Sequence, residues 1–445
     1  NVGTDMSGDP GFQGDFSFLN VSAASPQTGA TTRIQEGVNL VTASTVNVAA
    51  GTYNESVLID KALSLLGPNA GVDPCTMTRS AEAIITGTDP NGVIKVAAND
   101  VIIDGVKVIP VGTGVSGTYG ILIQNTQTNL TVRNVFIDGA ASDRDGINLW
   151  KGTGAHLHHN KIINAVYGIG GGSDDASNPT SAIIEDNCVS NTRLGITGYH
   201  NGSTIRRNLV KDFTLPPPAA GISGQLLNTS ISANTVTNYA QGAGVALTAY
   251  PPRPNSANVS ITNNFLNGNG AGIYFDAAAT LVGVEAHNND LSGNSVWSIQ
   301  NLSSATFCAT CNWYGVTSAT DVAAKISGPV RYTPWLTNGT DNSSDAGFQP
   351  VPGSCETAPP SCAITAIIPG PPKQIQVTVQ DLQSGLQSVT AVTLINATLN
   401  VPSFTIGTTS PVVVTATKVN ESQSSTVVLR VTDVAGNSVT CDPVY

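Results

Sequence analysis

The chain has 445 residues, of which 11% are charged and 40% are hydrophobic, and its formal net charge is −11. This acidic balance opposes binding to nucleic acid or to anionic lipid surfaces, because both are negatively charged. No segment reaches the ~18 uninterrupted apolar residues of a membrane-spanning helix, so we expect no membrane insertion. The 45 glycines and 25 prolines, with many Asn, Thr and Ser residues, favour short strands and tight turns. They predict an almost all-β protein.

The N-terminal region, residues 1–30, is rich in Gly, Ser and Asp with scattered Phe, and we predict an extended lead-in. The sequence opens on Asn1 rather than Met, which fits a mature form whose export signal has been removed. The segment Thr32–Val38 is predicted to form a short amphipathic turn. Such a turn would cap the first coil of a stacked β-structure, where bare strand edges invite aggregation.

Residues 31–335 are predicted to form one coiled body with a cap at each end. Its first strand-like runs are Thr45–Val48, Ser56–Ile59, Leu63–Leu66, Ala83–Thr86, Val93–Val96 and Val101–Pro110. A Gly-Ile or Gly-Val step then recurs, at Gly120, Gly146, Gly168, Gly195, Gly221, Gly244 and Gly272. Each step is followed by a second apolar stretch, and from the second step onward these stretches end near an Asn, at Asn160, Asn187, Asn208, Asn234, Asn264 and Asn289.

The intervals between these Asn residues are 27, 21, 26, 30 and 25 residues. A drifting period of this size is typical of a solenoid, in which each unit buries its apolar face only against its neighbours. We expect each Gly to let the backbone turn a corner and the branched residue after it to point inward. We expect the recurrent Asn side chains to stack at one corner as a structural ladder.

The C-terminal third changes character. Thr320–Ile326 is predicted to be a brief helix that closes the second end of the solenoid, and residues 336–362 are predicted to be a linker because of their Pro, Ser and Asn content. Residues 363–445 carry short alternating strands, which favour a small β-sandwich. The predicted strands are Ile375–Val379, Ser388–Thr393, Phe404–Ile406, Val412–Thr417 and Val427–Val431.

Seven cysteines favour export to an oxidising compartment. Cys362 and Cys441 bracket the last segment and are predicted to form a disulfide across the sandwich. Cys308 and Cys311 have the spacing of a redox motif or a zinc half-site, but no second pair matches it, and we favour a local disulfide. Cys188 is predicted to be a buried free thiol.

Several segments resemble known families. The coils resemble the right-handed parallel β-helices of the pectin-lyase-like superfamily, on Gly146-Ile147, Gly195-Ile196 and Gly221-Ile222. Thr45–Glu55 and Cys311–Gly315 resemble more narrowly the secreted bacterial surface proteins that carry such helices. The tail resembles bacterial immunoglobulin-like modules, on Val379-x-Asp381 and Val431–Asn437. The resemblance implies an all-β fold, a right-handed parallel β-helix followed by an immunoglobulin-like sandwich. It leaves the activity open, since this scaffold hosts lyases, hydrolases, epimerases, adhesins and fibres.

The enzymes of this superfamily act on acidic polysaccharides, and glycoside hydrolysis needs two placed carboxyls. The catalytic candidates lie close to the Gly-Ile steps, at Asp143, Asp145, Asp174, Asp175, Arg193 and His200. The motifs of polygalacturonases and alginate epimerases are absent, so turn capping and solvation of loops are the favoured roles of these acids. A mild basic band on the middle coils would either neutralise uronates or balance the acidic loops; it consists of Lys161, Arg193, Arg206, Arg207 and Lys211.

Other candidate sites carry weaker signals. The candidate sugar-stacking platforms are Trp150, Tyr199, Tyr250 and Tyr274. His156 and His158 alternate onto one side of a strand, but a third ligand is missing from the sequence nearby, so we predict no metal site there. Asp381 and Asp433 suit either Ca²⁺ binding or a turn, and we predict no other cofactor.

Two classes of function remain. The first is an extracellular structural or adhesive protein at the cell surface, with cell-surface glycans or further copies of itself as partners. It would self-assemble through its lead-in strand, its helix ends and the sandwich. The second is a lyase or hydrolase of acidic glycans, or a non-catalytic glycan-binding module.

Overall fold

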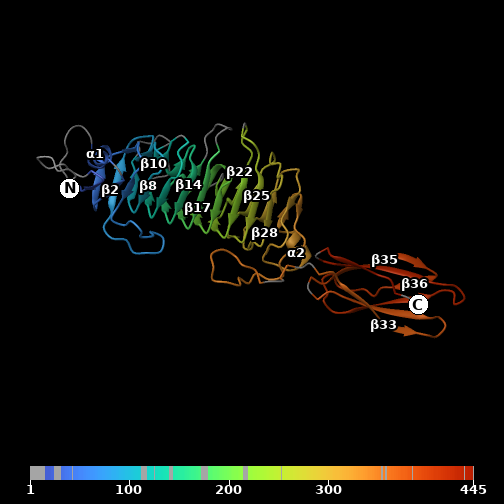
Figure 1. The fold of residues 1–445 in the computed structure, drawn as a ribbon. Helices are drawn as coiled ribbons and strands as arrows, with labels where there is room; N and C mark the ends of the chain where they lie inside the picture. The colour runs from blue at the N-terminus through green and yellow to red at the C-terminus, as the bar shows by residue number, and fades with distance from the viewer. Residues whose placement is uncertain are drawn as a thin grey trace, which may run out of the picture.

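A computed structural model of the protein describes residues 16–24, 32–42, 44–111, 118–124, 126–139, 144–171, 179–213, 219–251, 253–351, 354–355, 358–382, 384–434 and 436–443. Short strands stack into a rod, and a small sandwich of longer strands lies beyond its C-terminal end (Figure 1). The predicted fold class, an all-β parallel helix followed by a sandwich, is confirmed.

Successive coils pair in parallel along three faces of the rod. In the described residues, face 1 consists of β4 (Val57–Ile59), β7 (Ile94–Val96), β10 (Thr118–Ile123), β13 (Arg144–Leu149), β16 (Tyr167–Gly171), β19 (Leu194–Asn201), β22 (Ala220–Ser232), β24 (Ala243–Leu247), β27 (Ala271–Phe275), β29 (Trp297–Asn301) and β31 (Ile326–Ser327).

Face 2 adjoins face 1 through the long strand β22, whose second half belongs to it. Its other described strands are β1 (Phe18–Val21), β2 (Thr45–Val48), β5 (Ser64–Leu66), β8 (Ile102–Asp104), β11 (Thr131–Arg133), β14 (Thr153–His158), β17 (Ser181–Glu185), β20 (Thr204–Arg206), β25 (Ala257–Thr262), β28 (Glu285–His287), β30 (Phe307–Cys308) and β32 (Val330–Arg331).

Face 3 completes each coil as a separate sheet. Its described strands are β3 (Gly51–Asn54), β6 (Ala83–Gly87), β9 (Lys107–Pro110), β12 (Phe136–Asp138), β15 (Lys161–Ile163), β18 (Cys188–Ser190), β21 (Leu209–Phe213), β23 (Thr235–Tyr239) and β26 (Phe265–Asn267). The run Val101–Pro110, predicted as one strand, is two, because Gly105 takes a φ of 72° and turns the chain from face 2 to face 3.

The glycine of each Gly-Ile step is required for space. A Cβ built on Gly195 would lie 2.3 Å from Val210 Cγ1 and 2.5 Å from the carbonyl oxygen of Gly221, closer than side-chain atoms approach one another. The residue that follows the glycine points into the rod: Ile196 pairs with Ile222 on the next coil, and both are fully buried. The predicted inward column is confirmed, and the glycine lets face 1 lie close to face 3.

The predicted asparagine ladder is also confirmed. Each ladder side chain donates its amide to the Oδ1 of the next ladder residue at 2.9–3.0 Å, from Asn160 through Asn289. The ladder continues one coil further, to Asn312, at 2.9 Å. Each Oδ1 also accepts a backbone N–H of the preceding coil, as Asn208 does from Asn187. Polar groups buried at this corner are therefore satisfied by one another.

Both ends of the rod are covered. Helix α1 (Arg33–Leu40) buries Ile34 and Val38 against the first coils, and α2 (Ala319–Ala323) buries Val322 near the last. The predicted linker begins by folding back along the coils rather than leaving them. Phe348 is fully buried, its backbone N–H donates to the Asn263 carbonyl at 2.8 Å, and its ring lies 5.5 Å from that of Phe265.

The sandwich consists of two antiparallel sheets around one apolar core. Its described strands are β33 (Ser361–Ile368), β34 (Gln374–Gln380), β36 (Ala397–Asn400) and β37 (Val412–Lys418) in one sheet, with β35 (Leu386–Ile395), β38 (Thr426–Asp433) and β39 (Ser438–Cys441) in the other. The strand predicted at Phe404–Ile406 is wrong, because these residues lie in an irregular segment and the turn after it. Asp381 and Asp433 accept backbone N–H groups of Gly385 and Asn437, so both carry out the turn role.

Three disulfides connect segments distant in sequence. Cys362 pairs with Cys441 as predicted. The predicted Cys308–Cys311 bridge is wrong: Cys311 pairs with Cys355, and Cys308 is free. Three extended residues span about 10 Å, beyond the ~7 Å that two bridged Cα atoms allow. Cys188 is also not free, because it pairs with Cys75. This disulfide content is typical of an exported protein.

Candidate functional site

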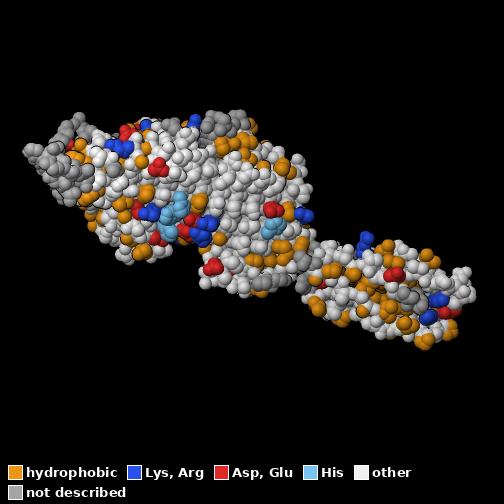
Figure 2. Space-filling view, in the orientation of Figure 1, with side chains coloured by type: hydrophobic (Ala, Val, Ile, Leu, Met, Phe, Trp, Pro, Cys, Tyr) orange, Lys and Arg blue, Asp and Glu red, His pale blue; other side chains and the backbone are white. Residues whose placement is uncertain are grey.

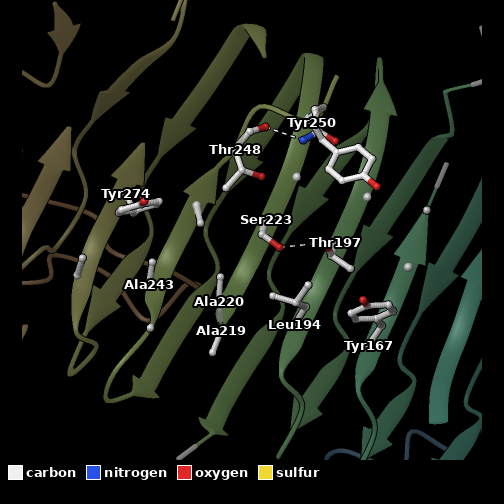
Figure 3. Close-up of a pocket in the computed structure, with 18 of the residues that line it drawn as sticks. Tyr167, Leu194, Thr197, Ala219, Ala220, Ser223, Ala243, Thr248, Tyr250 and Tyr274 are labelled. Atoms are coloured by element: carbon white, nitrogen blue, oxygen red, sulfur yellow. Dashed lines mark hydrogen bonds between the residues drawn. The ribbon is translucent and has the colours of Figure 1, made fainter. Parts of the chain in front are cut away.

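A groove of about 720 Å³ runs along the outside of face 1, across the strands from β10 to β29 (Figure 3). Two rows of outward-pointing side chains line the groove, and each row takes one residue from each strand. The first row is the residue before the glycine of each Gly-Ile or Gly-Val step, and the second row is the residue after the inward-pointing Ile or Val. The first row reads Tyr119, Asp145, Tyr167, Leu194, Ala220, Ala243, Ala271 and Trp297. The second reads Asn148, Gly170, Thr197, Ser223, Ala246, Tyr274 and Gln300.

The middle of the groove has a floor of small residues. Ala220, Ala243, Ala246 and Ala271 form an apolar cluster of their own, against which Leu194 packs. Small outward side chains leave the floor low, and neighbouring strands ~4.8 Å apart make the six strands from β16 to β29 about 24 Å long. The groove is therefore a long trough rather than a round cavity.

Aromatic side chains stand at both ends of this floor. Trp150 and Tyr167 line the N-terminal end and are partly exposed. Tyr274 and Trp297 line the C-terminal end and pack against the alanine cluster. Figure 3 shows Tyr274 and Tyr167 on opposite sides of Ala219, Ala220, Ala243 and Leu194. Each end thus offers flat apolar rings beside the alanine floor.

One rim is built by the segment after β24. Arg253 donates from Nη1 to Gln225 Oε1 at 3.2 Å, and Gln225 donates from Nε2 to the Thr248 carbonyl at 2.6 Å. The Arg253 guanidinium lies over the ring of Tyr250 at 5.4 Å and over the ring of Tyr199 at 5.9 Å. These contacts fix the rim and hold the Arg253 charge against two rings.

Asp145 and Asn148 lie at the N-terminal end of the groove. Asp145 is 8% exposed, and burial raises the pKa of its carboxyl to about 7, although the Tyr167 backbone and the Asn148 side chain each donate a hydrogen bond to it. The Asn148 Oδ1 is buried and has no hydrogen-bond partner among the described residues. An unsatisfied buried acceptor beside a buried carboxyl is unusual in a folded protein.

The other sequence candidates do not join Asp145. His200 is fully buried: its Nδ1 lies 3.1 Å from Ser203 Oγ, and burial lowers its pKa to about 4. Arg193 is exposed and directly precedes Leu194, a residue of the first groove row. Tyr199, predicted as a stacking platform, is only 3% exposed and lies under Arg253 rather than in the groove.

The other three predicted platforms, Trp150, Tyr250 and Tyr274, do line the groove. The remaining catalytic candidates, Asp143, Asp174 and Asp175, lie outside the described residues. Sequence reasoning missed Tyr167, Trp297, Asn148 and Arg253. The first row is visible in the sequence as the residue before each step glycine, and the pattern continues at Trp297, where serine replaces the glycine.

Face 2 carries the charged side chains that the groove lacks, including the histidines visible in Figure 2. Glu185 accepts from Arg206 Nε at 2.6 Å and from Arg207 Nη2 at 2.7 Å, and it lies 2.7 Å from His156 Nε2. The Nδ1 atoms of His158 and His159 lie 2.8 Å apart. Among the described residues, no three or more His, Cys, Asp or Glu are arranged to hold a metal ion.

The fold and the groove define the class of this molecule: a parallel β-helix protein with an elongated, largely uncharged groove on one face. A family model described as periplasmic copper-binding protein (NosD) matches residues 99–306. This match covers the middle coils. The described residues form no metal site that fits copper, so we derive no chemistry from that metal.

Several solved structures are similar in fold. DFA-IIIase from Arthrobacter chlorophenolicus A6, in complex with DFA-III, is 15% identical over 75% of this chain and 86% of that chain, with a TM-score of 0.40. The Dettilon tailspike protein gp208 is 12% identical over 90% of each chain, with a TM-score of 0.38. The A-module of the Azotobacter vinelandii mannuronan C-5 epimerase AlgE6 is 14% identical over 69% of this chain and 86% of that chain, with a TM-score of 0.43.

At these identities the likeness concerns the fold alone. A comparison with curated proteins gave no match. In the part of the chain that the structure describes, no helix is long and apolar enough to cross a membrane.

Proposed function

We propose that the protein is an exported glycan-binding protein and that the groove of face 1 binds a chain of neutral sugars. The observation that carries the proposal is the groove itself, with its alanine floor and the rings of Trp150, Tyr167, Tyr274 and Trp297 at the ends. Sugar rings present C–H groups on their faces and hydroxyls at their edges. The faces suit aromatic rings and alanines, and the hydroxyls suit the few placed polar groups that orient ligands in such sites.

The charge of the groove favours a neutral ligand. Among its described lining residues, Arg253 is the one cation and Asp145 the one carboxyl, and Arg253 is bonded to Gln225. Arg206 and Arg207, predicted from the sequence as part of a basic band, are ion-paired on face 2 instead. A chain of uronates would therefore meet little positive charge in the groove.

Binding is better supported than hydrolysis. Hydrolysis of a glycosidic bond uses two carboxyls on either side of the bond, and the described lining offers Asp145 alone. A hydrolase or lyase that draws a second acid from Asp143, Asp174 or Asp175 stays as the alternative. Formation of unsaturated or shortened oligosaccharides on incubation with polysaccharides would favour it.

A glycan array that includes neutral and acidic oligosaccharides tests the proposal. We expect binding to neutral chains that Trp297→Ala and Tyr274→Ala each weaken by roughly tenfold or more, as loss of an aromatic anchor does. The matched control is Phe136→Ala, which removes a surface ring on face 3, where Lys107 Nζ lies 4.6 Å from the ring centroid. Equal binding by wild type and both groove variants, or a preference for oligogalacturonate, would contradict the proposal.

We also propose that the protein acts as an adhesive protein at the cell surface and that it self-associates. The three disulfides support export. Strand β1 pairs with β2 of its own chain, and α1 packs against both, so a lead-in strand donated to a neighbour would have to leave this position. Electron microscopy of the purified protein tests assembly: ordered fibres would support it, and isolated rods would remove it.

A further inference from the structure

The N-terminal end of the groove differs from its floor because two polar side chains are buried there together. Asp145 and Asn148 both project outward from β13, one from each groove row. Tyr119 on β10 and Tyr167 on β16 line the groove on either side of Asp145, and Trp150 lines it beside Asn148. The pair therefore sits at the bottom of an aromatic enclosure open to the groove.

The hydrogen bonds of this pair are incomplete. Asn148 donates its amide to Asp145, while its Oδ1 is buried without a partner in the described structure. Leaving such an acceptor unpaired costs about 1–3 kcal/mol, and a ligand that supplies an O–H or N–H would recover this cost. A ligand in the groove that donates a hydrogen bond to the Asn148 Oδ1 would therefore be bound more tightly.

Among the described residues, no positively charged side chain contributes to the pKa of Asp145. The titratable groups that face its carboxyl from the neighbouring described strands are the phenols of Tyr119 and Tyr167, and the side chain hydrogen-bonded to it is the neutral amide of Asn148. Burial raises the pKa of the carboxyl to about 7. Below neutral pH most of these carboxyls keep their proton and can act as donors.

We propose that Asp145 and Asn148 form a donor–acceptor pair that recognises one ring of a neutral sugar chain, with the Asp145 carboxyl donating to a sugar oxygen and Asn148 Oδ1 accepting from a sugar hydroxyl. The rings of Tyr119, Tyr167 and Trp150 surround the bound ring. The inference rests on the proposed function and adds the subsite that orients the chain in an otherwise apolar trough.

A consequence is that binding weakens with rising pH. The ligand binds the protonated form, so ionisation of Asp145 removes the donor and leaves a buried charge. For a free carboxyl with a pKa of about 7, the protonated fraction, and with it the affinity, falls about tenfold from pH 6 to pH 8.

Isothermal titration calorimetry at pH 6 and pH 8 tests the subsite, with maltohexaose, cellohexaose, xylohexaose and mannohexaose as probes. We expect about tenfold weaker binding of the best probe at pH 8 for wild type. Asp145→Asn keeps a neutral donor, so its affinity should match the wild-type value at pH 6 and stay the same at pH 8. Asn148→Ala should weaken binding at both pH values. The control Asp212→Asn, which removes an exposed carboxyl outside the groove, should keep the wild-type affinity and pH profile.

The outcomes separate this inference from the proposed function. Binding that depends on Trp297 but has the same pH profile in wild type and Asp145→Asn would overturn the subsite and leave glycan binding standing. The absence of Trp297-dependent binding to any of the four probes would overturn both. Thermal unfolding of each variant confirms that its fold is intact before either conclusion is drawn.

Discussion

Face 1 and face 2 of the same rod differ in whether their polar side chains find hydrogen-bond partners within the protein. On face 2, Glu185 is bonded by Arg206, Arg207 and His156, so the charges satisfy one another. On face 1, the groove has an apolar floor and leaves the Asn148 Oδ1 unsatisfied. Because both faces are built on the same coils, their difference comes from the outward side chains alone. A satisfied face stabilises the protein, and an unsatisfied one is available to a ligand.

The largest effect is expected in the asparagine ladder, at the corner between face 2 and face 3. Asn208 lies in the middle of the ladder: it donates to the carbonyls of Ile184 and Arg206 and to Asn234, and it accepts from Asn187. Asn208→Ala leaves several buried groups unpaired, and we expect a loss of about 3 kcal/mol in the free energy of unfolding. Chemical denaturation measures it. Asn238→Ala, which removes an exposed amide bonded to Asp212, is the control, and equal losses in the two variants would contradict the role of the ladder.

Filling the groove should abolish binding without loss of stability. Ala246 lies on the floor between Ser223 and Tyr274, and Ala246→Arg places a long charged side chain across it. We expect a roughly hundredfold loss of affinity for neutral oligosaccharides, or about 2.7 kcal/mol. Ser260→Arg puts the same side chain on the outside of face 2 and should bind as wild type does. Similar affinities of the two variants would mean that the groove is not the binding site.

The sequence predicts the scaffold better than the groove, for a physical reason. Glycines such as Gly195 and asparagines such as Asn208 recur because every coil must satisfy the same spatial and hydrogen-bonding constraint. The repeat alone therefore predicts the inward column and the ladder. Ala246 and Ser223 look featureless in isolation, and they become a groove floor only when the register between coils is known. Aligning the residue before each step glycine would have found Tyr167 and Trp297.

Other parts of the site depend on contacts between residues far apart in the sequence, which no local sequence pattern specifies. Arg253 comes from a connection between coils, and its place on the rim depends on Gln225, one coil earlier. His200 looks like an exposed candidate from its neighbours in sequence, but it pairs with the buried Leu226 on β22 and is itself fully buried. The partners of Cys75 and Cys311 are likewise set by how the coils and the fold-back segment pack.

On face 2, Glu185→Gln should lower stability without changing binding. Burial raises the pKa of Glu185, but the hydrogen bonds from Arg206 and His156 and the nearby guanidinium charges outweigh it, so the pKa falls to about 2. Because the folded pKa lies below the ordinary value of 4.5, the stabilisation is present above pH 4.5 and is lost as the pH falls towards 2. The cationic partners are about a third or more exposed, so we expect only about 1–2 kcal/mol.

Chemical denaturation at pH 7 and at pH 3 measures this effect. The difference in stability between wild type and Glu185→Gln should be smaller at the lower pH. Asp212→Asn, which breaks the exposed pair with Lys211, should change stability by less than ~0.5 kcal/mol. Weaker glycan binding by Glu185→Gln at pH 7, with the fold intact, would show that the two faces are not independent.

The smallest effect is expected at Cys308, which the structure leaves outside the three disulfides. Its Sγ lies 2.9 Å from Arg331 Nη2 on the next coil, and its side chain is only partly buried. Cys308→Ser keeps a hydrogen-bond acceptor of similar size, so we expect a change below ~0.5 kcal/mol, as for most surface substitutions. Under denaturing, non-reducing conditions, alkylation of the wild type should label this thiol alone. Labelling of Cys355 instead would restore the local bridge between Cys308 and Cys311 and contradict the fold-back of residues 336–355 onto the last coils.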